Sequence, residues 1–170
     1  MTEEKTPQNI QELVGEIGER LVLFNLFAEA HERPYLEIFK NYSESGYDIG
    51  IHNHRTKKKV KIEVKTRQRR ITTNRDPYDA HFTLTQNERD NADFLVGYWL
   101  EHNSYFIVPI NELDEMRNGK HKDGTPRFVH KHIVRKSSVT GEYTDKSIPW
   151  LNSWNLILDF VDPIKPKRKK

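Results

Sequence analysis

Two acidic side chains and one basic side chain, Asp48, Glu63 and Lys65, stand at spacings that suit phosphate chemistry. They lie in the segment 46–68, GYDIGIHNHRTKKKVKIEVKTRQ, where two short apolar runs surround a basic turn. If the turn is centred on residues 54–57, the segment forms a β-hairpin with Asp48 opposite Glu63, because side chains alternate between the faces of a strand. Lys65 then shares their face, and the aliphatic side chains of both strands lie on the other.

This charged face suits a divalent metal ion. Carboxylates placed opposite each other repel and destabilise a strand pair, and a cation between them removes that cost. Mg²⁺ prefers such oxygen ligands and shares its coordination sphere with phosphate, and a bound metal ion can activate water and neutralise charge on a phosphoryl oxygen. A nearby lysine can orient the attacking water or help to deprotonate it. The plain alternative is that this face is only the solvent-exposed side of an amphipathic hairpin.

The same residues resemble the motif of the PD-(D/E)xK nuclease superfamily, which includes type II restriction enzymes, Mrr-like enzymes, archaeal Holliday junction resolvases and some intron-encoded endonucleases. Fourteen residues separate the two halves of the motif, and tyrosine stands where many members have proline. The halves read Gly46-Tyr47-Asp48 and Glu63-Val64-Lys65.

A second part of the resemblance lies upstream. The sequence GEIGER at residues 15–20 is similar to the first-helix motif of the resolvase and Mrr-like branch, in which a glutamate projects towards the metal site. Glu19 is the better match to that glutamate, and Glu16 is the reserve. The resemblance as a whole spans residues 13–110.

The resemblance implies a Mg²⁺-dependent endonuclease that hydrolyses DNA phosphodiester bonds by in-line attack of water, without a covalent intermediate. It implies that Asp48 and Glu63 bind Mg²⁺ with the backbone carbonyl of Val64, and that Mn²⁺ can substitute. Lys65 would position or activate the water, and Glu19 would hold a second metal ion or a metal-bound water. Because two DNA strands need two active sites, the resemblance also implies a homodimer or higher homo-oligomer.

Basic residues flank the predicted site on both sides. Residues 51–75 hold ten basic side chains and one acidic side chain, Glu63, although the net charge of the whole chain is only +3. Clustered positive charge is typical of polyanion binding, and phosphate contacts make such binding salt-dependent; the alternative is that these side chains are merely solvated. The residues that we expect to contact DNA are Lys57, Lys58, Lys59, Arg67, Gln68, Arg69, Arg70 and Arg75.

The periodicity of apolar residues predicts the elements that must position these side chains. Apolar residues at three- and four-residue steps predict a long helix over residues 9–31, with its second half apolar nearly all round and therefore buried on more than one side. Thr85 and Glu88 form a capping-box pattern that predicts a helix up to about residue 92. The other expected elements are strands at 35–42, 47–51, 60–65, 94–100, 105–109 and 128–134, helical turns at 111–117, and a closing helix at 150–161 after Pro149.

This order of elements predicts an α/β fold, with the long first helix packed on the sheet. Together with the resemblance, it indicates a restriction-endonuclease-like core (helix, three strands, helix, two strands) with a C-terminal helical extension. We expect a single nuclease-like domain over residues 1–162. The basic segment 163–170 should be disordered, because like charges and low hydrophobicity do not offset the entropy of ordering.

Composition excludes several classes of site. The chain has no cysteine, so disulfides, thiolate metal sites and thiol nucleophiles are excluded. No apolar stretch approaches the roughly 20 residues that span a bilayer, and the N-terminal residues are polar. We therefore expect a cytoplasmic protein without a membrane partner.

Two pairs of histidines invite a metal assignment. His52-Asn53-His54 spells HNH, but the HNH nuclease signature consists of three residues far apart in sequence, and we expect this tripeptide to be exposed at the hairpin turn. His130 and His132 share one face of a predicted strand without an evident third ligand. We therefore predict no zinc site at either place.

Two other functions are compatible with the sequence. One is a non-catalytic DNA-binding module of the same fold, although idle sites usually lose a carboxylate or the lysine, and all three are present here. The other is a protein-interaction domain with an aromatic surface, which would not bind nucleic acid at moderate salt. Metal-dependent cleavage separates both from a nuclease.

Overall fold

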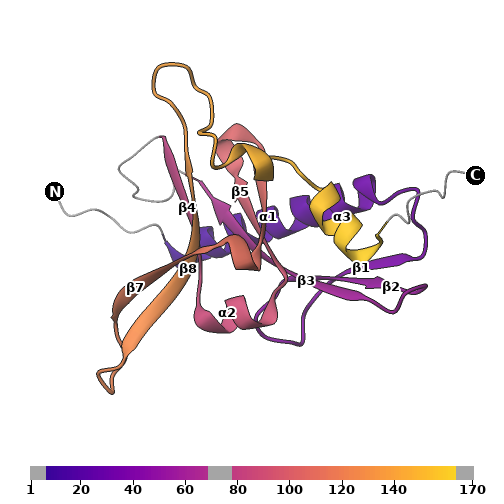
Figure 1. Ribbon diagram of the computed structural model, residues 1–170, viewed down its shortest axis with the longest axis horizontal. Coiled ribbons are helices and arrows are strands. Elements are labelled where there is room, and N and C mark those ends of the chain that lie inside the picture. The colour runs from indigo at the N-terminus through magenta and orange to yellow at the C-terminus, as the bar shows by residue number, and fades with distance from the viewer. Residues whose placement is uncertain (1–6, 69–77, 164–170) are drawn as a thin grey trace, which may run out of the picture.

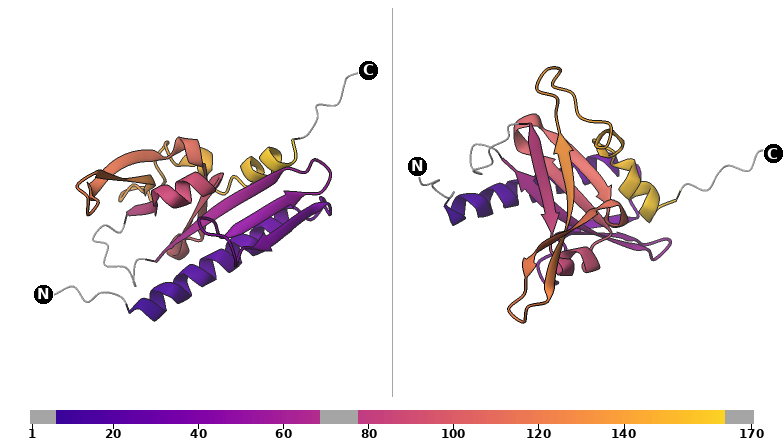
Figure 2. Two further views of the ribbon diagram at one scale, coloured as in Figure 1. Left: turned by 90° about the horizontal axis from the view of Figure 1, so that it is seen from below. Right: turned by 60° about the vertical axis from the view of Figure 1, so that its left-hand side comes forward.

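Residues 7–68 and 78–163 are described in a computed structural model of the protein. They form two β-sheets and three α-helices in a mixed α/β arrangement. The helix α1 (Gln8–Glu29) covers one face of a five-stranded sheet, and a three-stranded sheet packs on the other face (Figures 1 and 2). Arg69, Arg70 and Arg75, and all of the predicted basic tail after Pro163, lie outside the described residues.

The helix α1 approaches the middle of the first sheet closely at one glycine. A Cβ atom at Gly18 would overlap the side chain of Thr66, so only glycine lets the helix lie this near to the strand. Val22 and Leu26 follow one and two turns later and are fully buried against the sheet. Although α1 is long, no helix among residues 7–68 and 78–163 combines the length and apolarity needed to span a membrane.

The prediction that the second half of α1 is buried on more than one side is wrong. Phe24 is 69% exposed and Phe27 is 52% exposed. Together with Leu13 and Ile17 they form a stripe along one side of the helix, because steps of four, seven and three residues return to nearly the same direction. The apolar residues of α1 therefore cover the sheet on one side and leave an apolar stripe exposed on another.

The five strands of the first sheet lie in the order β1-β2-β3-β5-β6. Strands β3 and β5 pair in parallel, and the other neighbours pair in antiparallel fashion. In the β2–β3 hairpin Ile51 pairs with Val60 and Gly50 with Lys61, which confirms the register predicted from a turn centred on residues 54–57. The strands are β1 (Leu36–Lys40), β2 (Ile49–Asn53), β3 (Lys59–Arg67), β5 (Phe94–Trp99) and β6 (Ser104–Pro109).

The second sheet was predicted only in part. It consists of β4 (Asp79–Leu84), β8 (Pro126–Arg135) and β7 (Asp114–Lys120), in the order β4-β8-β7. The strand predicted at 128–134 is confirmed as part of β8, but β4 was not predicted. The helical turns predicted at 111–117 are confirmed only as a short 3₁₀ turn, η2 (Ile110–Glu112). The residues that follow are extended because they pair with β8, although all of β7 is exposed.

The short helix α2 (Gln86–Asn91) confirms the predicted capping box. The Thr85 side chain accepts a hydrogen bond from the backbone N–H of Glu88, and the Glu88 carboxylate accepts one from the backbone N–H of Thr85. These reciprocal bonds satisfy two N–H groups that have no partner within the helix. They also fix the direction of the Glu88 side chain at the start of α2.

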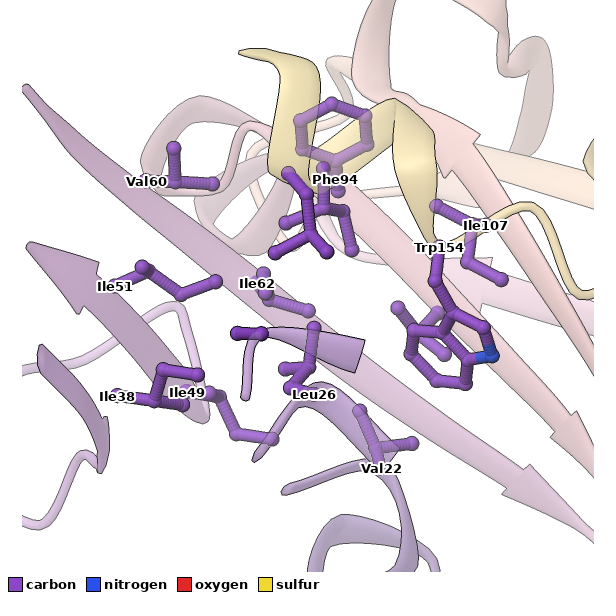
Figure 3. Close-up of a cluster of buried hydrophobic side chains, with 14 of the residues drawn as sticks. Val22, Leu26, Ile38, Ile49, Ile51, Val60, Ile62, Phe94, Ile107 and Trp154 are labelled. Atoms are coloured by element: carbon purple, nitrogen blue, oxygen red, sulfur yellow. The ribbon is translucent and has the colours of Figure 1, made fainter. Parts of the chain in front are cut away.

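The closing helix belongs to the hydrophobic core that α1 shares with the first sheet, whereas Trp150, just before it, packs on the core of the three-stranded sheet. A 3₁₀ turn, η3 (Ile148–Trp150), precedes α3 (Asn155–Val161), so the closing helix begins later than predicted. Asn152, with a positive φ of 51°, separates the two helical segments and donates and accepts hydrogen bonds with Tyr105 of β6. Figure 3 shows Trp154 among the buried aliphatic side chains of α1 and the first sheet.

Candidate active site

Asp48 and Glu63 lie side by side on the face of the first sheet opposite α1. The backbone N–H of Asp48 bonds to the carbonyl of Ile62 at 2.9 Å, which continues the hairpin pairing by one step beyond β2. One oxygen of Asp48, Oδ2, accepts a hydrogen bond from the backbone N–H of Val64 at 2.8 Å. Glu63 is only 5% exposed. The face predicted to carry the charged groups is therefore not the solvent-exposed side of the hairpin at this point.

Lys65 joins this pair through its ammonium group. Its Nζ lies 2.7 Å from Oε1 of Glu63 and 2.7 Å from Oε1 of Glu88, which belongs to α2. The lysine side chain is 30% exposed, so the bridge lies at the edge of the buried region and can be reached from solvent. The three predicted residues are thus brought together, and a fourth charged side chain joins them.

Glu88 is the site residue that the sequence analysis missed. Its other oxygen, Oε2, accepts hydrogen bonds from the backbone N–H and the hydroxyl of Thr85, at 2.7 and 3.0 Å. One carboxylate therefore caps α2 and holds Lys65. The capping-box pattern located Glu88 correctly, but only the packing of α2 beside β3 gives it the second role.

The pKa values of Asp48 and Glu63 are raised, because the two carboxyl groups are buried and lie close to each other. Burial raises the pKa of Glu63 to about 7, and the negative charge of Asp48 adds to the shift. Burial also raises the pKa of Asp48, although the hydrogen bond from Val64 acts in the opposite direction. Ionising both groups is therefore unfavourable unless a cation lies nearby.

The ammonium of Lys65 supplies part of that positive charge. Burial alone would lower the pKa of Lys65, but the contacts with Glu63 and Glu88 outweigh burial and raise it. Burial likewise acts to raise the pKa of Glu88, and its hydrogen bonds with Lys65 and Thr85 reverse the shift and lower it. Lys65 is thus held as a cation between two carboxylates. The lowered pKa of Glu88 favours its ionised form, whereas the raised pKa of Glu63 opposes ionisation.

Glu19 lies at the edge of this group, and Glu16 does not. Gly18 seats α1 close to β3, and the adjacent Glu19 is near enough for its charge to raise the pKa of Asp48. The Glu19 carboxylate is 2.8 Å from Nζ of Lys40 on β1. Glu16 instead pairs with Arg20 at 2.7 Å on the outer side of α1.

The donor set fits a hard divalent cation. The carboxylates of Asp48 and Glu63 are the oxygen ligands that Mg²⁺ prefers, and Mg²⁺ commonly binds through only one or two carboxylates and several waters. A cation here would also relieve the unfavourable ionisation of two neighbouring buried groups. The described structure does not test the predicted ligation by the carbonyl of Val64, which stays a prediction.

Those predicted DNA-contacting residues that the structure describes divide into two groups along β3. Lys57, Lys58 and Lys59 lie at its start, and the Lys58 ammonium sits 3.6 Å from the centre of the Phe160 ring. Arg67, at its end, is 8% exposed, so it would have to become more accessible to reach a phosphate. Gln68 follows directly and is partly buried. Contact of these residues with DNA stays a prediction.

The tripeptide His52-Asn53-His54 is exposed only in part, although we expected all of it to be exposed. Asn53 of the HNH tripeptide is fully buried and not exposed, whereas His54 is exposed and His52 is intermediate. His132 is 1% exposed, and His130 forms a hydrogen bond of 2.9 Å with Gln86 of α2. Among the described residues, one group of three metal-ligating side chains lies within metal-binding reach of one another, and it contains His52 and His54 but neither His130 nor His132.

Comparison with known proteins is informative through structure. The sequence matches no protein-family model and no curated protein sequence. The fold is similar to that of the bacterial homing endonuclease I-Ssp6803I, with a TM-score of 0.55 over 88% of this chain and 91% of that chain. Sequence identity is 13%, so the likeness concerns the fold. The mixed α/β arrangement described above is therefore an architecture that a homing endonuclease also has.

Proposed function

We propose that this protein is a divalent-metal-dependent DNA endonuclease of the PD-(D/E)xK superfamily, with Mg²⁺ as its cofactor and Mn²⁺ as a substitute. The observation that carries the proposal is the convergence of Asp48, Glu63 and Lys65 on one partly enclosed sheet face. Carboxylates of raised pKa beside a lysine are typical of functional sites rather than of surface pairs. The fold similarity to a homing endonuclease supports the same assignment.

In this proposal Asp48, Glu63 and the carbonyl of Val64 hold the metal ion, and Glu19 holds a second ion or its water. When bound, the metal ion activates water and neutralises charge on the phosphoryl group. Lys65 remains protonated between its carboxylate partners, which favours a role in orienting the water and the phosphate over deprotonation. Glu88 keeps the ammonium group in position from the side of α2.

DNA would be held at the start of β3 through Lys57, Lys58 and Lys59, and at its end through Arg67 and Gln68, with Arg69, Arg70 and Arg75 following in the sequence. Because cutting both strands needs two active sites, we propose a homodimer or higher oligomer. The exposed apolar stripe of α1 (Leu13, Ile17, Phe24 and Phe27) supports association, since exposed apolar side chains in a row favour contact with another protein surface. Sedimentation of the intact chain beside Phe24→Glu tests this part separately from catalysis.

The test of activity is cleavage of supercoiled plasmid, linear duplex and four-way-junction DNA with Mg²⁺, with Mn²⁺ and with EDTA. We expect metal-dependent cutting that is lost in Glu63→Ala and in Lys65→Ala. Glu142→Gln, which changes an exposed glutamate in a distant loop, is the matched control and should cut normally. Circular dichroism and thermal melting verify that each variant is folded.

The outcomes distinguish the proposed functions. Salt-sensitive DNA binding without cutting in either metal would favour the non-catalytic DNA-binding module. Cutting that survives both substitutions would place the active site elsewhere. Absence of both binding and cutting at moderate salt would favour the protein-interaction domain.

A further inference from the structure

A second group of ligand side chains lies on the same sheet face, farther along the β1–β2 pair. Glu37 of β1 is paired in register with His52 of β2, and His54 follows two residues later on the same face. The Glu37 Oε2 atom lies 3.1 Å from Nε2 of His54 and 3.8 Å from Nδ1 of His52. Ligand atoms of all three residues lie within 4.8 Å of one another. Two imidazoles therefore converge on one carboxylate oxygen.

The backbone beneath this group is held firmly by Asn53. Its Oδ1 accepts hydrogen bonds from the backbone N–H groups of Arg55 and Thr56, at 2.9 and 3.1 Å. Its Nδ2 donates to the carbonyl of Val161 at 3.1 Å, which ties the turn to the end of α3. The backbone N–H of His54 also bonds to the carbonyl of Tyr35, so the strand pairing continues past β2. The two histidines thus stand on a fixed backbone, as ligands in a preorganised site do.

The geometry is close to that of a zinc site. Zinc binds imidazole nitrogen and carboxylate oxygen at about 2.0–2.2 Å in tetrahedral geometry, which places ligand atoms roughly 3.3 Å apart. The separations of 3.1 and 3.8 Å straddle that value, and the ligand atoms all lie within 4.8 Å of one another, so small rotations of the half-buried His52 and of the exposed His54 and Glu37 side chains suffice. Two histidines with one glutamate are also a known ligand set for zinc, with the fourth position left to water or another ligand.

We propose that Glu37, His52 and His54 form a binding site for a transition-metal ion of the Zn²⁺ class, separate from the carboxylate site. Imidazole ligands favour Zn²⁺, Cu²⁺ and Ni²⁺, whereas Mg²⁺ prefers oxygen ligands alone, so the two sites select different metals. The bound ion joins β1 to β2 at the end of the hairpin and stabilises the folded chain. A hollow of about 560 Å³, which Glu37 and His52 help to line, lies beside the three side chains.

A hydrogen bond between one histidine and one glutamate would not explain this arrangement. The surface pair of His31 and Glu32 has a similar separation of 3.8 Å between Nε2 and Oε1, but it involves a single imidazole. At the proposed site the rings of His52 and His54 lie 4.5 Å apart, centre to centre, and are inclined at 48°. Only His54 lies within hydrogen-bond distance of the Glu37 oxygen, at 3.1 Å. A bound cation would give a ligand interaction to both imidazoles.

The test uses the full chain with Asp48→Asn and Glu63→Gln as the background, so that the carboxylate site does not contribute a second binding event. Calorimetric titration with Zn²⁺ should show one equivalent bound, and Co²⁺ should give the visible absorption of tetrahedral nitrogen and oxygen ligation. Zn²⁺ should raise the melting temperature, because an ion that binds only the folded state stabilises it. Mg²⁺ should not compete.

The variants decide whether these three residues are the ligands. His54→Ala and Glu37→Gln, which alter exposed side chains and should leave the fold intact, must each abolish the stoichiometric binding and the thermal shift. His31→Ala is the matched control and must retain both. Absence of Zn²⁺ binding in the background protein, or binding that persists in His54→Ala, would overturn the proposal.

Discussion

The sheet face opposite α1 carries two groups of candidate metal-binding side chains that differ in chemistry and burial. At one end Asp48 and Glu63 offer carboxylates only, and Glu63 is 5% exposed. At the other end His52 and His54 offer imidazoles beside Glu37, whose side chain is 55% exposed. Strand β2 thus borders two environments, one with β3 that brings like charges together and one with β1 that brings a carboxylate beside imidazoles.

The two groups are kept apart by Gly50 and Phe39. Gly50 of β2 lies between Asp48 and His52 in the sequence, and its strand partner is Phe39. The Phe39 ring packs directly over Gly50, so close that a Cβ atom at this position would overlap it. Four residues along a strand correspond to roughly 13 Å, so the two groups do not share an ion. One hairpin register thus places two carboxylates where burial opposes their ionisation, and places two imidazoles beside a largely exposed carboxylate.

The largest expected effect is on cleavage. Asp48→Asn removes a carboxylate charge but leaves an amide oxygen that can still accept the hydrogen bond from Val64, so the fold should persist. Loss of several kcal/mol of charge stabilisation corresponds to a rate decrease on the order of 10²–10⁴-fold. Single-turnover cleavage assays measure this decrease. Asp123→Asn is the control, because Asp123 also accepts a hydrogen bond from a backbone N–H, that of Thr125, at 2.9 Å; equal losses in both variants would contradict the assignment.

The next effect tests whether the histidine group and the carboxylate group are held by different residues. Asn53→Ala removes four hydrogen bonds at a fully buried position, which should lower the free energy of unfolding by about 2–4 kcal/mol. It should weaken Zn²⁺ binding although Asn53 is not a ligand. Urea denaturation and calorimetry measure the two quantities.

Asn41 is the counterpart at the carboxylate end. Its side chain donates to the carbonyls of Glu44 and Tyr47, and its backbone N–H bonds to the carbonyl of Asp48. Asn41→Ala should therefore reduce cleavage more than Zn²⁺ binding, the reverse of Asn53→Ala. If the two variants affected both activities equally, the ends would not be independent.

A smaller effect is expected from Glu88→Ala. The substitution removes the capping-box carboxylate of α2 and one of the two partners of Lys65. We expect a loss of about 0.5–2 kcal/mol in unfolding free energy and a decrease in cleavage smaller than that of Asp48→Asn, because Glu63 still holds Lys65. Thr85→Ala is the matched variant, since it disturbs the cap without touching Lys65. A cleavage defect of equal size in both would assign Glu88 to capping alone.

The last expected effect is a pH dependence of stability. Glu63 ionises near its ordinary pKa of 4.5 in the unfolded chain and at about 7 in the folded protein. Between these values the folded state binds more protons, so this group makes the metal-free protein less stable as pH rises from about 4.5 to 7. Glu63→Gln should therefore melt above the unsubstituted protein at pH 8 and lose that advantage near pH 5. Thermal melts in EDTA measure the difference in melting temperature between the two proteins. A difference that does not change with pH would contradict the destabilisation assigned to ionised Glu63.

Several features could be predicted because they depend on neighbouring residues along the chain. The alternation of residues 47–51 and 60–65 fixed the faces of the hairpin, and the turn length set its register. The Thr85–Glu88 pattern located the start of α2, because a capping box involves only local backbone groups. The first helix was also located correctly, within about two residues at each end.

The missed features depend on contacts between distant segments. β4 and β7 form by pairing with β8, and β7, exposed along its length, has no burial pattern to reveal it. The burial of the second half of α1 was overestimated, because apolar composition does not tell how many neighbours a helix has. Phe24 and Phe27, which are 69% and 52% exposed, lie on a side of α1 that does not face the sheet.

The sequence by itself therefore determined that Asp48, Glu63 and Lys65 share a sheet face, since strand alternation and turn length require no other part of the molecule. Only the tertiary structure decided what surrounds them. Glu88 reaches Lys65 from 23 residues away, and Glu37 reaches His54 across 17 residues. Periodicity describes how a segment presents its own side chains, whereas the partner that each side chain meets depends on how separate elements pack.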